Sequence, residues 1–335
     1  MSVAPPGAQD TVAVAVPAGE HQTKQAHPPR RARRRAAVSP AATGVSTWFR
    51  YALLGPLLIL VLVVVVLPFL GAVVLSFTDT TLISISRDGW SGLEFTGFQQ
   101  FMDALTDPAF HHSLLVTAIF ATGSLLLEFG VGISLALLVN RQMRVGKMLT
   151  TIFIVPILMP PVAIGLIWKF MLDDSLGILN YTLSLVGLGP VSWLSSDLAL
   201  PTLIVVHAWM ATPFVFLVML AGIRSLPVEP MEAAMIDGAN AWQRFRRITL
   251  PLLRPVIAVV LVIRAIDAIK SFDVIFTLTG GGPGTQTEAV ELYVYRAAFN
   301  SMELGYGSAL SVLLVAALVV PALLFLRSYG RVEEN

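Results

Sequence analysis

The sequence contains no cysteine and has few charged residues for its length. Without cysteine, disulfides, thiol catalysis and cysteine-based metal sites are excluded. Only 13% of the 335 residues are Asp, Glu, Lys or Arg, which is about half the fraction typical of a soluble domain. By contrast, 56% are hydrophobic, and the mean hydropathy is +0.77. These values predict an integral membrane protein. The net charge of +1 matters less than where the charges lie.

Motifs for nucleotide binding and catalysis are also missing. The stretch Gly280-Gly281-Gly282-Pro283-Gly284 is rich in glycine, but it lacks the Gly-Lys-Ser/Thr that a P-loop needs. Neither a His-Glu-x-x-His zinc motif nor a set of nucleophile and base stands out. We therefore expect a chain that is not an enzyme and holds no cofactor or metal of its own.

Residues 1–47 form a tail rich in Ala, Pro and Gln that could not bury a core, so we expect it to be disordered. Its basic run could bind anionic lipid, or it could simply keep the tail in the cytoplasm, which we favour. The run consists of Arg30, Arg31, Arg33, Arg34 and Arg35.

Six apolar segments are long enough to cross a bilayer as helices, since a spanning helix needs about 20 residues. The third is interrupted by Pro160-Pro161, which must kink or break it. The sequence thus predicts an all-α membrane protein with six transmembrane helices. The segments are 52–76, 114–139, 149–171, 198–223, 252–278 and 307–327.

The connections between these segments alternate in basic residues. Those that hold many Lys and Arg should face the cytoplasm, which places both termini and residues 226–251 there. The remaining connections, 77–113, 172–197 and 279–306, hold only Arg87 and Arg296 and should lie outside. We expect three regions: the tail 1–47, a first helix with its external loop at 48–113, and a core of five transmembrane helices at 114–330.

Residues 226–251 form a charged island that reads as two short helices with a corner between them. Pro227 and Pro230 suit the start of the first helix, and Gly238 suits a left-handed stop. Asn240 with Gln243 predicts a capping box for the second helix, which Pro251 should end. A DNA-binding helix-turn-helix would look similar locally, but the apolar flanks argue against a nucleic-acid partner.

This island resembles the EAA loop of permease subunits in binding-protein-dependent ABC importers, where the loop docks on a separate ATPase. The resemblance implies that Glu232, Ala233, Ala234, Asp237, Gly238 and Ala239 form the ATPase-coupling surface. It extends over residues 50–330, through Val155-Pro156-Ile157, Ala208-Trp209-Met210 and Thr279-Gly280-Gly281-Gly282-Pro283. These motifs are similar to the carbohydrate-uptake branch, and within it to the maltose-type first permease.

The resemblance implies a type I importer (MetI-like) fold and several partners. These are a second homologous permease, an ATPase homodimer in the cytoplasm, an external substrate-binding protein and the bilayer of the inner (cytoplasmic) membrane. ATP and Mg²⁺ would be bound by the ATPase and not by this chain.

Polar residues at membrane depth point independently to a path, because ionisable groups in lipid usually face an interior cavity. The fifth segment contains Arg264, Asp267, Lys270, Ser271 and Asp273. On a continuous helix Arg264, Ala268 and Ser271 would share one stripe. Asp267 is three residues from both Arg264 and Lys270, so some charges should pair, and such pairs could instead lock helices together.

A lone membrane histidine such as His207 is commonly a neutral group bonded to a neighbouring helix, and no role is evident for Glu128. The resemblance, however, matches His207 to a position that presents a polar side chain to sugar. It implies substrate contacts from eight residues: Ile157, Pro161, His207, Met210, Ala211, Arg264, Ala268 and Ser271.

We therefore predict the permease subunit of an ATP-driven importer that moves a sugar, oligosaccharide or polyol by alternating access. One alternative is an importer of another solute such as glycerol phosphate, for which Arg264 could bind the anion. Another is a proton-coupled secondary transporter that uses Glu128, Asp267 and His207, although no broken-helix pair or inverted repeat is evident.

Overall fold

The computed structural model describes residues 47–141, 151, 153 and 155–333, and within these residues it contains helices and loops but no extended sheet. The chain divides into two units, residues 1–57 and 58–335. Residues 1–46 of the predicted tail 1–47 and the basic connection 142–150 lie outside the described residues. In the first unit, the described part is the start of α1 (Thr47–Val61).

Among the described residues, three helical stretches are long and apolar enough to span a membrane: Leu54–Leu75, Pro108–Asn140 and Ala199–Arg224. The first is built from the end of α1, the π turn η1 (Leu62–Val66) and α2 (Leu67–Leu75). The second and third belong to α5 (Pro108–Arg141) and α9 (Ala199–Arg224). These match the first, second and fourth predicted segments within a few residues.

Over the described residues, the apolar helical stretches of the third and sixth predicted segments are shorter, and the fifth segment is interrupted. The third breaks at Met159 and Pro160, as the proline pair predicted, and resumes as α7 (Pro161–Met171). The sixth lies within α15 (Leu304–Glu333). The fifth was predicted as one helix over 252–278, which is wrong: α12 (Leu250–Ile269) ends before Lys270, and α13 (Phe272–Leu278) begins two residues later.

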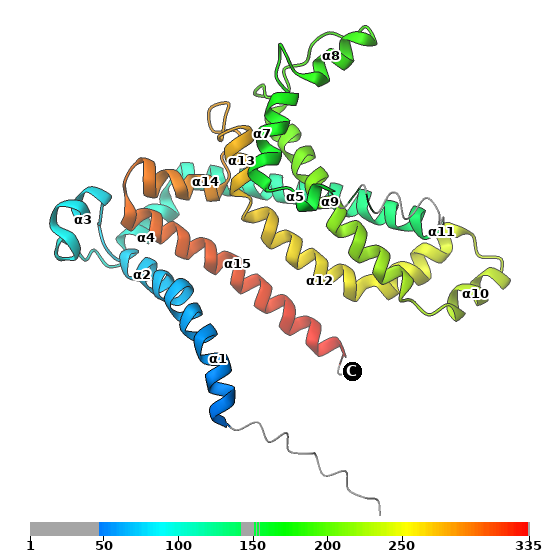
Figure 1. Ribbon diagram of the computed structural model, residues 1–335, viewed down its shortest axis with the longest axis horizontal. Coiled ribbons are helices and arrows are strands. Elements are labelled where there is room, and N and C mark those ends of the chain that lie inside the picture. The colour runs from blue at the N-terminus through cyan, green and yellow to red at the C-terminus, as the bar shows by residue number, and fades with distance from the viewer. Residues whose placement is uncertain (1–46, 142–150, 152, 154, 334–335) are drawn as a thin grey trace, which may run out of the picture. The chain divides into compact units, whose positions relative to one another are not determined.

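The core of the second unit forms where α5 packs along α9 and α12 crosses both (Figure 1). One cluster of buried side chains includes Phe216 and Met219 of α9 with Leu253 of α12. The approach of α5 to α9 depends on Gly132, because a Cβ there would lie 2.9 Å from Cγ1 of Val215. A second cluster joins Phe120 of α5 and Leu203 of α9 to the α13 side chains, against which α7 packs.

Short helices connect the longer ones. Those between α2 and α5 are α3 (Leu82–Asp88), the 3₁₀ turn η2 (Gly89–Gly92) and α4 (Gln99–Thr106). The connection from α7 to α9 contains α8 (Ile178–Leu185), and that from α13 to α15 contains α14 (Val290–Tyr295) and the π turn η4 (Arg296–Asn300). The side chain of Asn180 bonds to Val191 and Trp193 and so closes the α8 connection.

The glycine-rich stretch at 280–284 forms a closed turn. Three of its glycines, Gly280, Gly281 and Gly284, have positive φ angles of 59°, 89° and 58°. Arg296 donates to the carbonyl of Gly280 and to Oε1 of Glu288, both at 2.6 Å. The carbonyl of Gly280 is therefore held by a side chain of this chain, which fits a structural turn rather than a phosphate cradle.

Candidate functional site

The charged side chains at membrane depth meet where α5, α9 and α12 come together. Glu128 of α5 is fully buried and accepts hydrogen bonds from Nε and Nη2 of Arg264 at 2.9 and 3.3 Å. Nη1 of Arg264 donates to Oδ2 of Asp267 at 2.9 Å. Arg264 therefore bridges two carboxylates, one buried and one whose side chain is 56% exposed.

His207 of α9 completes this group. Its Nδ1 lies 3.2 Å from Oε1 of Glu128, but the two atoms are not aligned for a hydrogen bond. The ring is 2% exposed and meets Phe120 edge-on at a centroid distance of 4.9 Å. Ser124, one turn before Glu128 on α5, is also buried, and its hydroxyl has no hydrogen-bond partner among the described residues. We call Glu128, His207, Arg264 and Asp267 the charge network.

The eight predicted substrate residues differ widely in exposure. His207, Arg264, Ala211 and Ala268 are buried. Met210 and Ser271 are partly buried, whereas Ile157 and Pro161 are exposed. The structure thus brings His207 and Arg264 together, since both lie beside Glu128. The guanidinium of Arg264 is already paired with the carboxylates of Glu128 and Asp267.

Ser271 does not lie on the predicted helical stripe. Because α12 ends at Ile269, the 100° spacing that placed Ser271 beside Arg264 does not continue to residue 271. Ser271 has ψ 75° and precedes the first residue of α13. It therefore occupies the break between two helices, where backbone groups leave the helical hydrogen-bond ladder.

The predicted coupling loop has the local structure that its sequence indicates. The first helix is α10 (Glu229–Ile236), with Pro230 in its first turn, and Gly238 follows with φ 77°. The second is α11 (Ala241–Arg244), whose start carries the reciprocal bonds of a capping box between Asn240 and Gln243. Because the loop obeys local rules of helix starts and stops, its fold could be predicted without tertiary contacts.

Pro251 does not end the second helix, so that prediction is wrong. The helix passes through the π turn η3 (Phe245–Thr249) directly into α12, with Pro251 at its start. Proline has no N–H to donate to the preceding turn. The wider π turn immediately before it is a form in which helices tolerate such an irregularity. Helix α11, the π turn and α12 are consequently one continuous helix, whereas α10 is separated from it by the corner at Gly238.

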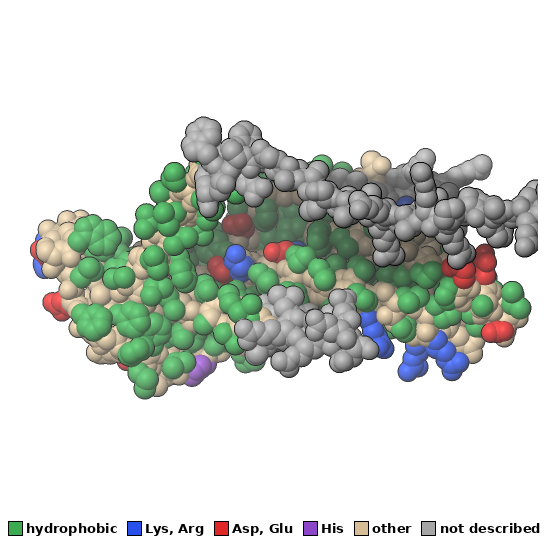
Figure 2. Space-filling model, turned by 90° about the horizontal axis from the view of Figure 1, so that it is seen from below, with side chains coloured by type: hydrophobic (Ala, Val, Ile, Leu, Met, Phe, Trp, Pro, Cys, Tyr) green, Lys and Arg blue, Asp and Glu red, His purple; other side chains and the backbone are tan. Residues whose placement is uncertain are grey.

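Most of the coupling surface is open. Glu232, Ala233, Asp237 and Gly238 are exposed, and Ala234 and Ala239 are partly buried. No residue of α10 is buried, and the apolar side chains Met235 and Ile236 are 52% and 88% exposed. Figure 2 shows acidic and basic side chains gathered over these elements. Arg244 donates to the carbonyl of Ala239 at 2.8 Å and so holds the corner.

A groove of about 1330 Å³ runs beside the coupling loop. It is lined by apolar side chains of α5, such as Phe129 and Leu137, and by Met231 and Trp242 of the loop. A second cavity of about 270 Å³ lies between α7 and α9, with Trp168 and Trp209 in its wall. Neither is lined by a member of the charge network.

The role of Glu128 was missed by sequence reasoning because its partner Arg264 is 136 residues away. An acidic residue amid an apolar helix was the available signal. Among the described residues no group of three or more His, Cys, Asp or Glu side chains could hold a metal ion.

The comparisons with known proteins agree with the fold. Residues 128–334 match the family described as "Binding-protein-dependent transport system inner membrane component". The trehalose/maltose transport system permease protein MalF of Thermococcus litoralis is 37% identical over 290 residues, which is 86% of this chain and 97% of the relative. The sn-glycerol-3-phosphate transport system permease protein UgpA of Brucella suis is 33% identical over 272 residues, 80% of this chain and 90% of that protein.

A solved structure has the same fold. A chain of a bacterial ABC transporter for import of the acidic polysaccharide alginate aligns with a TM-score of 0.72 and 28% identity, covering 85% of this chain and 96% of that one. A chain from the same kind of transporter, in complex with an alginate pentasaccharide-bound periplasmic protein, gives 0.71 and 27%, with coverage of 85% and 95%. The predicted fold class, an all-helical importer permease, is confirmed. The chain belongs to the inner membrane components of binding-protein-dependent transport systems, as an ABC importer permease that is not itself an enzyme.

Proposed function

We propose that this permease moves a sugar, oligosaccharide or polyol across the inner (cytoplasmic) membrane by alternating access. The relatives named for trehalose/maltose, starch degradation products and alginate transport support a carbohydrate. The relatives also include a glycerol-phosphate permease, so membership of the family leaves the charge of the substrate open.

The observation that carries the proposal is the open coupling loop. Helix α10 has no buried residue, so packing against its own chain stabilises it little. Its exposed apolar side chains, Met235 and Ile236, are typical of a surface that binds a partner. We assign that partner as a cytoplasmic ATPase homodimer, which would hold the ATP and Mg²⁺. ATP binding would move the loop, and hydrolysis would reset it.

We assign the remaining partners on the basis of the family resemblance. A second homologous permease would pack beside this chain and complete the path, and a substrate-binding protein would deliver the ligand from outside. Ligand could shift the balance between inward and outward states only through different affinities for the two. We assign the substrate contacts to eight residues: Ile157, Pro161, His207, Met210, Ala211, Arg264, Ala268 and Ser271.

Both termini and the coupling loop are assigned to the cytoplasm. Single cysteines placed in this cysteine-free chain at Arg244, Trp90 and Tyr181 test that orientation, since Trp90 and Tyr181 are exposed. A membrane-impermeant maleimide added to intact cells should label the cysteines at 90 and 181 but not the one at 244. The reverse pattern would refute the orientation.

The transport mechanism is tested in proteoliposomes that contain the full complex. Uptake of radiolabelled maltose, trehalose and glycerol phosphate should require internal ATP and the binding protein, and it should not need an ion gradient. Uptake driven by a proton gradient without ATP would overturn the proposal in favour of a secondary transporter.

A further inference from the structure

The positive charge of Arg264 is cancelled from inside the protein. Its guanidinium donates two hydrogen bonds to Glu128, which is fully buried, and one to Asp267. Arg264 itself is only 8% exposed. An unpaired guanidinium at membrane depth would be costly, and removing its partner would leave that charge uncompensated. Glu128 thus fixes the position of the guanidinium, and its negative charge weakens the positive potential that Arg264 exerts beyond the packed helices.

The charge network has a net charge of −1 when His207 is neutral, since two carboxylates face one guanidinium. The neutral form of His207 with its proton on Nδ1 would set an N–H beside Glu128 without adding charge. The exposed end of the network is acidic, because Asp267 is 56% exposed while Glu128 and Arg264 are buried. An approaching solute therefore meets a carboxylate before it meets the arginine.

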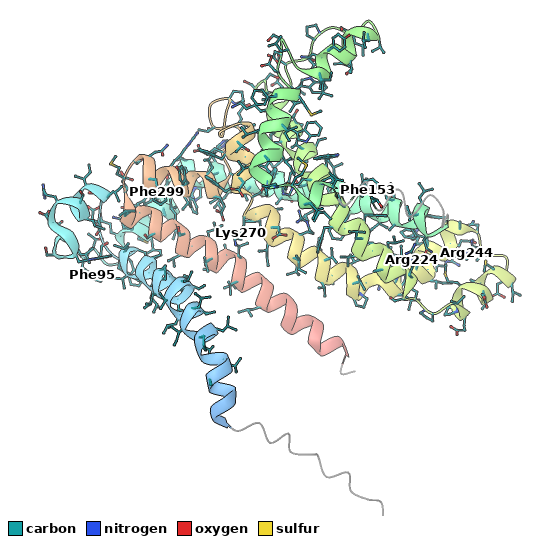
Figure 3. The ribbon with its side chains drawn as sticks, viewed as in Figure 1. Phe95, Phe153, Arg224, Arg244, Lys270 and Phe299 are labelled. Atoms are coloured by element: carbon teal, nitrogen blue, oxygen red, sulfur yellow. The ribbon has the colours of Figure 1, made fainter. Side chains whose placement is uncertain are left out.

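The ionisable side chains nearest in sequence do not reverse this sign. Lys270 follows Asp267 by one turn, and Asp273 follows in the first turn of α13 (Figure 3 labels Lys270 at this junction). Glu291 of α14 interacts with both of them. One lysine with two carboxylates leaves this group without excess positive charge. Figure 2 shows such charged side chains amid a mostly hydrophobic face.

We propose that Glu128 is a positioning residue for charge selectivity: it holds and neutralises Arg264, so that Asp267 faces the path and uncharged sugars or polyols are favoured over anionic solutes. This inference rests on the proposed function, because it requires the exposed end of the network to line the substrate path. A carboxylate accepts hydrogen bonds from sugar hydroxyls. It repels phosphate, sulfonate or uronate groups by the same charge.

The test measures the electrostatic potential at the break beside Asp267, with no need for a known substrate. Ser271→Cys in the assembled complex provides one thiol in this chain, since the chain has no cysteine. Rates of modification by a cationic and an anionic methanethiosulfonate of similar size are then compared by mass spectrometry of this subunit. The ratio of the two rates reports the sign and size of the local potential.

Four backgrounds separate charge from structure. The network carries −1 in the parent, 0 with Glu128→Gln, −2 with Arg264→Gln, and −1 again with both. The cation-to-anion ratio should fall with Glu128→Gln and rise with Arg264→Gln, each by roughly threefold to tenfold, because one unit charge shifts the two reagents in opposite directions. The double variant should return to the parent ratio although it has lost the ion pair.

Several results would overturn the proposal. One is a ratio that moves the same way in both single variants and further in the double, since that pattern indicates disrupted packing. Another is a parent ratio that favours the anionic reagent, and a third is a cysteine that neither reagent reaches. Failure of ATP-driven sugar uptake with the expected ratios intact would instead reject the proposed transport function and leave the electrostatic assignment standing.

Discussion

Replacing Asp107 by alanine should destabilise the protein. The effect should be larger than that of removing any other exposed or half-buried carboxylate from the connection between α2 and α5. Oδ2 of Asp107 accepts hydrogen bonds from the hydroxyls of Tyr293, in α14, and Tyr306, in α15. Oδ1 accepts from the backbone N–H of Ala109 at 2.8 Å, at the start of α5. One side chain thus ties the beginning of a spanning helix to two later helices.

The size of the effect follows from these contacts. Loss of a helix N-cap costs about 0.5–2 kcal/mol, and a hydrogen bond to a charged group contributes about 1.5–3 kcal/mol. The two tyrosine bonds share one oxygen, so they are not additive. We expect Asp107→Ala to lower the free energy of unfolding by about 2–5 kcal/mol in all.

Thermal denaturation of the detergent-solubilised complex provides the measurement, with Asp103→Ala as the matched control. Asp103 is exposed on α4 and carries the same charge. A clearly lower melting temperature is expected for the Asp107 variant alone. Equal melting temperatures for the two variants would show that the shared contacts contribute nothing.

The same site predicts a dependence on acid. Burial alone would raise the pKa of Asp107, but the hydroxyls of Tyr293 and Tyr306 and the backbone N–H groups outweigh it and lower that pKa. A folded pKa below the unfolded one stabilises the protein above the unfolded value, and this stabilisation is lost as the pH falls through the folded pKa. As the pH falls below about 4, the wild type should therefore lose the stabilisation that the ionised Asp107 provides. The Asp107→Asn variant lacks this carboxylate and should not show that loss.

Three further outcomes are expected. Gly132→Ala should cost about 1–3 kcal/mol by forcing α5 from α9, whereas Gly130→Ala on the same helix meets nothing within 4 Å and should be tolerated; equal melting would refute this. Glu232→Lys or Gly238→Pro should abolish uptake while the subunit still inserts, because proline cannot adopt φ 77°; full uptake would remove the coupling assignment. His207→Leu should reduce the yield of assembled complex by removing a polar neighbour of Glu128; normal yield and uptake would mean that the histidine only fills space.

Local rules explain what could be predicted from the sequence. The coupling loop depends on Pro230, Gly238 and the Asn240–Gln243 pair, each of which acts within four residues. Hydropathy located the long spans because a bilayer demands a continuous apolar stretch. These signals need no knowledge of distant parts of the chain.

Tertiary contacts explain what could not. The break between α12 and α13 has no proline or glycine to mark it, since the residues there are Lys270 and Ser271. The pairing of Arg264 with Asp267 was expected from their spacing. However, the guanidinium donates two hydrogen bonds to Glu128 on another helix and only one to Asp267. Asp107 likewise gained its role from residues almost 200 positions later.

The continuity of the helix through Pro251 changes how coupling must be understood. From Ala241 to Ile269 the chain is one continuous helix that contains the π turn η3 and, within α12, Pro255. The coupling loop lies at one end, and the charge network lies near the other, roughly 30 Å away at 1.5 Å per residue. Figure 3 shows Arg244 and Lys270 at opposite ends of this element.

A continuous helix can transmit a displacement along its backbone without a chain of side-chain rearrangements. If the loop moves with an ATPase, Arg264 moves with it, and the bonds from Arg264 to Glu128 require α5 either to follow or to release it. Because releasing a buried ion pair is costly, α5 and α12 should move together. The part of the chain that moves with α12 then ends at the helix break beside Ser271. There the side chain of Asp267 is exposed, and α13 starts as a separate helix.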